Sequence, residues 1–127
     1  MLGSRPIIGF VATKDFDRSQ AFYGGALGLR FIANDGFALV FESAGTMIRV
    51  VKVGVFVPAP YTILGWQVDA MQDAVTGLTE RGVVFERYPG LEQDKLGIWT
   101  APGGAQVAWF KDPDGNLLSV SHHGAAA

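Results

Sequence analysis

The chain has 127 residues, 49% of them hydrophobic and 17% charged, with 17 Gly and 6 Pro, a composition typical of one compact, turn-rich domain. A net charge of −2 and the lack of a basic cluster argue against a nucleic-acid partner. The chain has no cysteine, hence no disulfide or thiolate ligand. No signal-type segment or apolar stretch of about 18 residues is present, so we expect a soluble, cytoplasmic protein without a membrane partner.

The first half predicts a strand, a helix and three further strands. Residues 6–12 are an apolar run of strand formers. Asp15 and Asp17 can then cap a helix that Gly28 ends. Three β-type runs follow at residues 29–33, 37–42 and 46–53, separated by turn-forming residues at 34–36 and 43–45. The expected order is βαβββ.

The same order begins again after a connector at residues 56–60. A strand is expected at residues 62–68, followed by a helix capped by Asp69, with an apolar face repeating from Met71 to Leu78 and an end at Gly82. Further strands are expected near residues 83–87, 97–100, 105–111 and 116–122, the last two joined by a Pro-Asp-Gly turn. Residues 8–11 match 63–66 weakly, and 29–31 match 83–85.

These patterns predict an α+β fold of two tandem βαβββ modules, at about residues 6–57 and 60–122. We expect them to form a single domain over residues 5–123, with residues 124–127 as a flexible tail. The patterns alone also allow a ferredoxin-like or generic α+β sandwich in which two helix–strand units resemble each other by accident.

Two motifs bear on this choice. Residues 15–29, which read DFDRSQAFYGGALGL, resemble the first helix of the vicinal oxygen chelate (VOC) superfamily, the glyoxalase, bleomycin-resistance protein and dioxygenase group. Residues 110–116, FKDPDGN, resemble the final hairpin of the same superfamily. The resemblance covers about residues 6–122. It implies two curved mixed sheets whose concave faces line a cavity, and often a dimer.

The resemblance also implies four metal-ligand positions, usually His or Gln, Glu, His and Glu. In this sequence they fall at Ile8, at or near Arg49, at Ile63 and at Ser119. Divalent cations need carboxylate oxygen or imidazole nitrogen, which these four residues do not supply. We therefore expect no metal, no other cofactor and none of the family's metal-dependent chemistry.

The alternation of side chains along strands assigns a mostly apolar set to the cavity, with a few polar groups. The candidate ligand-binding residues are Phe10, Met47, Arg49, Gln67, Trp109 and Ser119. Trp109 offers a stacking face, and Arg49 needs an anion, a ligand or an internal carboxylate, unless a register error of one residue turns it to solvent. Trp66 is assigned to the opposite, helix-facing side. The plainer alternative is that these residues pack together or against a partner subunit.

Catalytic residues are not identifiable from the sequence. Tyr23, Glu42, Glu86 and Asp94 could each act as an acid or base, but no paired partner is evident. His122 and His123 end the last strand and point to opposite faces, so a solvated strand end is expected rather than a displaced metal site.

Three functions remain open. The first is a metal-free protein, likened to the bleomycin-resistance branch, that binds or sequesters a small apolar or aromatic ligand, neutral or anionic, and forms a homodimer. The second is a VOC enzyme, a lyase, isomerase or dioxygenase, with relocated metal ligands or no metal. The third is a structural or regulatory dimer without a small-molecule site.

Overall fold

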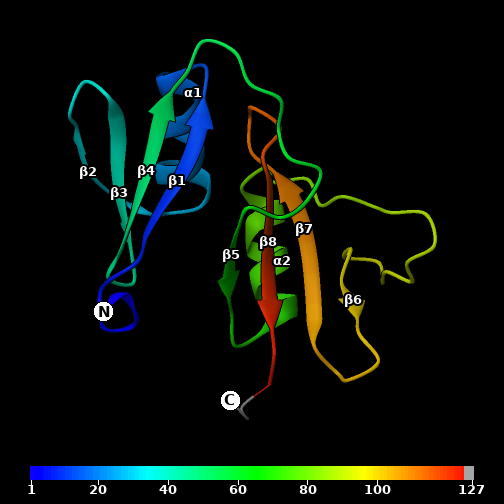
Figure 1. The fold of residues 1–127 in the computed structure, drawn as a ribbon. Helices are drawn as coiled ribbons and strands as arrows, with labels where there is room; N and C mark the ends of the chain where they lie inside the picture. The colour runs from blue at the N-terminus through cyan, green and yellow to red at the C-terminus, as the bar shows by residue number, and fades with distance from the viewer. Residues whose placement is uncertain (125–127) are drawn as a thin grey trace. The chain divides into compact units, whose positions relative to one another are not determined.

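The computed structural model describes residues 1–124. Its chain divides into two compact units, the first spanning Met1–Pro58 and the second beginning at Ala59. Each unit contains one four-stranded sheet (Figure 1). Among the described residues, no helix is long and apolar enough to cross a membrane.

The first unit is built on strands β1 to β4. After a short 3₁₀ turn, η1 (Leu2–Ser4), β1 (Ile8–Thr13) leads into α1 (Phe16–Gln20) and a π-helical continuation, η2 (Ala21–Ala26). The strands β2 (Arg30–Asn34), β3 (Ala38–Ser43) and β4 (Thr46–Lys52) follow. Their order in the sheet is β1-β4-β3-β2, with β1 parallel to β4 and the other pairs antiparallel.

The second unit repeats this arrangement. It contains β5 (Leu64–Gln67), α2 (Met71–Glu80), β6 (Trp99–Thr100), β7 (Gln106–Lys111) and β8 (Leu117–His122). The sheet order is β5-β8-β7-β6, with β5 parallel to β8. In each unit the first strand lies beside the last, and the helix connects the first strand to the other three. The predicted α+β fold of two βαβββ modules is therefore confirmed.

The first helix begins where the sequence predicts. The Asp15 side chain accepts hydrogen bonds from the backbone N–H groups of Asp17 and Arg18, which have no partner inside the helix. Ser19 donates to the Thr13 hydroxyl at 2.6 Å, which joins the helix to the end of β1. Gly28 has a φ of 76°, the left-handed conformation that ends many helices.

Aromatic side chains fill the core of each unit. In the first unit, Tyr23 is completely buried and its ring lies 5.3 Å from Phe22 and 6.1 Å from Phe41, measured between centroids. In the second unit, Phe110 is completely buried and packs edge-on against Phe85 at 5.5 Å. These rings give each sheet one face that is closed by its own helix.

The hairpin between β7 and β8 is held by one carboxylate. Asp112 Oδ1 accepts the backbone N–H groups of Asp114 and Asn116, each at 2.9 Å. Its Oδ2 accepts the Asn116 amide at 2.8 Å, and both residues are nearly buried. The second motif of the sequence is thus a self-contained turn that sets the register of β7 against β8.

Two local predictions for the second unit are wrong. The helix α2 begins after Ala70, not Asp69, and no side chain caps it. The strand expected near residues 83–87 is reduced to a single bridge between Phe85 and Phe110. That segment leaves the sheet at once, because Gln93 instead bonds the backbone of Glu86, Tyr88 and Gly97 and folds residues 86–97 into a loop.

Candidate functional site

One face of the first sheet is left open by the helices. Strand pairing sets Ile8 beside Met47 and Phe10 beside Arg49, so these four side chains share a face that we call the first open face. The intervening residues, such as Val11 and Val50, are buried in the core. Phe10 is 63% exposed, Ile8 46% and Met47 40%. The unit therefore presents large apolar side chains to solvent from one face of its paired strands β1 and β4.

Arg49 lies on the same face and has an internal partner. Its Nη2 is 2.7 Å from Asp35 Oδ2, where Asp35 belongs to the turn between β2 and β3. The hydrogen bond from Arg49, together with backbone N–H groups of Phe37 and Ala38, lowers the pKa of Asp35 from 3.8 to about 2. Of the partners expected for this cation, the structure supplies the internal carboxylate.

The second sheet has a corresponding surface, the second open face. Gly65, Trp109 and Ser119 lie side by side on it, since Ser119 pairs with both of the other two. Gln67 lies two residues after Gly65 in β5, on the same face and beside Ser121. Trp66 has the opposite parity and pairs with Val120, which is buried in the core, so its assignment to the helix side agrees with the register.

An aromatic cluster lies on the second open face. The ring of Trp109 is 6.0 Å from that of Trp99, with 33° between their planes, and 5.5 Å from that of Tyr88, nearly perpendicular to it. Trp99 comes from β6 and Tyr88 from the loop before it. Sequence reasoning identified only Trp109. The pairing of Trp99 with Val107, two residues before Trp109, could have been inferred from the turn at residues 101–104, whereas nothing in the sequence locates Tyr88.

The four positions that correspond to the family's metal ligands do not fit a divalent cation. Ile8 and Ile63 have no donor atom, Arg49 is cationic and already bonded, and Ser119 offers one hydroxyl. No cluster of three His, Cys, Asp or Glu side chains suited to a metal occurs in residues 1–124.

The four candidate acids and bases are engaged in structural contacts. Glu42 Oε1 accepts from Arg30 at 3.0 Å, and Glu86 lies 3.8 Å from the ammonium of Lys111. Asp94 accepts the backbone N–H groups of Leu96 and Ile98, and Tyr23 is completely buried. The sequence revealed none of these partners, which lie on neighbouring strands or in the folded loop.

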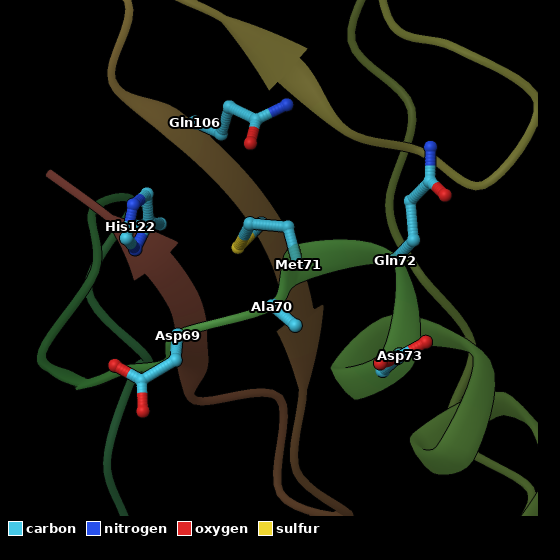
Figure 2. Close-up of a pocket in the computed structure, with 7 residues that line it drawn as sticks. All are labelled: Asp69, Ala70, Met71, Gln72, Asp73, Gln106 and His122. Atoms are coloured by element: carbon cyan, nitrogen blue, oxygen red, sulfur yellow. The ribbon is translucent and has the colours of Figure 1, made fainter. Parts of the chain in front are cut away.

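A separate polar hollow of about 400 Å³ lies beside the start of α2 (Figure 2). His122 borders it and donates from Nδ1 to the Val68 carbonyl at 2.8 Å, since a carbonyl can only accept. The His122 ring is therefore held by Val68, the residue after β5, and is half-buried, so this part of the strand end is less solvated than expected. His123 is exposed and its Nε2 lies 3.0 Å from the Ser121 hydroxyl. The lining residues are Asp69, Ala70, Met71, Gln72, Asp73, Gln106 and His122.

Comparison with known structures places the fold among many relatives. The protein resembles a glyoxalase/bleomycin resistance protein/dioxygenase superfamily member from Sphaerobacter thermophilus, with a TM-score of 0.74, 18% identity, and 97% and 100% of the two chains covered. It also resembles a glyoxalase family protein from Bacillus anthracis, with a TM-score of 0.72, 17% identity, and 92% and 93% covered. It also resembles a lactoylglutathione lyase from Agrobacterium tumefaciens, with a TM-score of 0.71, 16% identity, and 94% of each chain covered.

These identities establish the fold and nothing finer. No curated protein matches the chain. The sequence model of the Glyoxalase/Bleomycin resistance protein/Dioxygenase superfamily matches residues 7–120, which is most of the chain. The protein therefore belongs to the glyoxalase/bleomycin resistance protein/dioxygenase superfamily.

Proposed function

We propose that this protein is a metal-free member of the superfamily that binds a small, neutral, apolar or aromatic molecule on the open faces of its strands, and so carries or sequesters it. The proposed contacts are Phe10, Met47, Arg49, Gln67, Trp109 and Ser119. The observation that carries the proposal is the exposure of Phe10, Ile8 and Met47, which lie on one face of the paired strands β1 and β4. Clustered, exposed apolar side chains of this kind are typical of surfaces that bind a ligand or another macromolecule.

The charge of the ligand follows from Arg49. A free guanidinium on an apolar face would favour an anion. Here Asp35 holds Arg49 at 2.7 Å, and the Arg49 side chain is only 25% exposed. An anionic ligand would have to compete with a carboxylate that is already bonded, so we favour a neutral one.

Metal analysis separates this proposal from the enzyme hypothesis. The protein is purified without added metal, its metal content is measured, and divalent cations are then titrated while the fluorescence of its three Trp residues is followed. We expect no stoichiometric metal and no saturable response. One tightly bound cation per chain would overturn the metal-free proposal and favour a VOC enzyme with relocated ligands.

Ligand binding is tested with naphthalene derivatives and calorimetry. We expect Phe10→Ser to weaken binding severalfold, because it removes an apolar contact from the first open face. Val84→Ser is the matched control, since Val84 is 75% exposed but lies outside the strands. Equal affinities for the two variants would exclude Phe10 from the site.

A homodimer and a cytoplasmic location complete the proposal. Strand edges and exposed apolar side chains on each sheet give a physical reason for pairing with a second copy. Sedimentation at several concentrations tests the dimer: a monomer at all of them would exclude it. The absence of cysteine fits a reducing compartment.

A further inference from the structure

The second open face combines aromatic rings with one unusual hydroxyl. Tyr88, Trp99 and Trp109 come from three different segments and meet with centroid distances of 5.5 and 6.0 Å around Trp109. All three side chains are partly exposed. The rings of Trp99 and Trp109 are inclined by only 33°, and partly exposed aromatic rings of this kind offer a flat molecule a face on which to stack.

Ser119 lies directly opposite Trp109 in the β7–β8 ladder and is 93% buried, being 7% exposed. Among residues 1–124, no group forms a hydrogen bond with its side chain. Its oxygen is nevertheless within reach of solvent, because the described residues include no side-chain N or O atom that is both fully buried and unpaired. A recessed hydroxyl without a partner is a group that a ligand can satisfy.

Gly65 makes the space that this hydroxyl occupies. A Cβ atom added at Gly65 would lie 2.6 Å from Ser119 Oγ and 3.4 Å from the Ser119 carbonyl oxygen. Any larger residue at position 65 would therefore push the hydroxyl away. The backbone of Gly65 is not in the left-handed region, so its role is to leave room, not to permit a turn.

The charged groups around this face have partners. Glu86 faces Lys111 at 3.8 Å, and the Arg87 guanidinium donates to the carbonyls of Asp94 and Lys95 at 2.6 and 2.7 Å. Gln67, on the same face, is neutral. A ligand therefore meets aromatic rings and neutral hydrogen-bonding groups, a setting that favours an uncharged molecule.

We infer that Ser119, seated in the space left by Gly65, selects neutral planar aromatic molecules that carry a hydroxyl or carbonyl group on the ring, while Tyr88, Trp99 and Trp109 hold the ring itself. This inference rests on the proposed function, since it names the class of ligand that the second open face would bind. It adds Tyr88 and Trp99 to the contacts and assigns Ser119 to a hydrogen bond.

The test compares naphthol with methylnaphthalene, which have nearly the same shape. Calorimetry gives the ratio of their dissociation constants for the unmodified protein and for Ser119→Ala. We expect the ratio to shift against naphthol by about three- to tenfold in the variant, the value of one neutral hydrogen bond, with the affinity for methylnaphthalene nearly unchanged. Ser121→Ala is the matched control, because Ser121 lies on the same strand and face but is bonded to His123.

Gly65→Ala provides a second variant that keeps the hydroxyl but displaces it, and circular dichroism checks that each variant is folded. We expect the same shift in the ratio as for Ser119→Ala. If both compounds bind and neither variant changes the ratio, the hydroxyl has no role and the inference fails while the proposed function stands. If neither compound binds the unmodified protein, the proposed function and the inference both fail.

Discussion

The hairpin carboxylate of Asp112 offers a sharp test of how the second unit is held together. In Asp112→Ala, three donors lose their acceptor: the backbone N–H groups of Asp114 and Asn116 and the side-chain amide of Asn116. Asn116 is only 3% exposed, so water has little access to two of them. In Asp112→Asn, the remaining oxygen can still accept both backbone N–H groups, and only the bond to the Asn116 side chain is lost.

The expected loss in the free energy of unfolding follows from the number of hydrogen-bond donors left without an acceptor. An unsatisfied buried donor costs about 1–3 kcal/mol, and partial rearrangement of the turn reduces the sum. We therefore expect Asp112→Ala to lower the free energy of unfolding by about 2–4 kcal/mol and Asp112→Asn by about half as much.

Urea unfolding followed by Trp fluorescence measures this directly, because Trp66, Trp99 and Trp109 all lie in the second unit. Glu92→Ala is the control: its exposed side chain forms no hydrogen bond or ion pair with residues 1–124, so the change should stay within about 0.5 kcal/mol. A loss below about 1 kcal/mol in Asp112→Ala, or equal losses in both Asp112 variants, would refute the role given to this carboxylate.

Three further predictions concern backbone conformation and charge. Gly77→Ala lies within α2 with open space around the new methyl group, so it should stabilise the protein by about 0.5–1 kcal/mol, whereas Gly82→Ala, at a φ of 92°, should destabilise it by about 1 kcal/mol. Thermal unfolding measures both changes in stability, and changes of the same sign would contradict the backbone argument. The pKa of Asp35 lies at about 2, below its ordinary 3.8, so its ionised form stabilises the fold above pH 3.8 and this contribution is lost as the pH falls toward 2. The stability difference between the unmodified protein and Asp35→Asn should therefore vanish over that range in pH-dependent urea unfolding, and a difference independent of pH would argue against the Arg49 pair. Burial, and secondarily the charge of Glu86, raises the pKa of Tyr88. Glu86→Gln should therefore lower the pKa of Tyr88 part of the way toward its ordinary value, as measured by an NMR titration of the tyrosine ring carbons. An unchanged pKa would exclude Glu86 as a cause.

Local signals in the sequence were sufficient for much of the fold. The Asp15 cap, the end of the first helix at Gly28 and the turn at residues 112–115 each depend on a few neighbouring residues, and the structure has all three. The duplicated order of elements then constrains how the strands pair. The wrong prediction for the start of α2 involves distant residues: Val68, the residue after β5, still donates its N–H to the Ser121 carbonyl, and α2 begins only after Ala70.

The candidate site was less predictable for the same reason. Side-chain alternation correctly put Phe10 and Arg49 on one face, as their pairing requires. It could not reveal that Asp35, fourteen residues earlier, reaches across to Arg49 from a turn. Nor could it bring Tyr88 to Trp109, because the loop that carries Tyr88 is ordered by the Gln93 side chain and not by a strand. Whether the six candidate residues bind a ligand stays a prediction.

The irregular pairing of β2 with β3 bears on how the protein behaves when concentrated. Between Phe31 and Ala33 the register shifts, and Ile32 is left outside the ladder at the margin of the first sheet. A strand from another molecule that tried to extend the sheet at β2 would meet an interrupted row of hydrogen-bonding groups. Growth of ordered fibres from this edge is thereby opposed, even though Phe31 and Ile32 are both substantially exposed there.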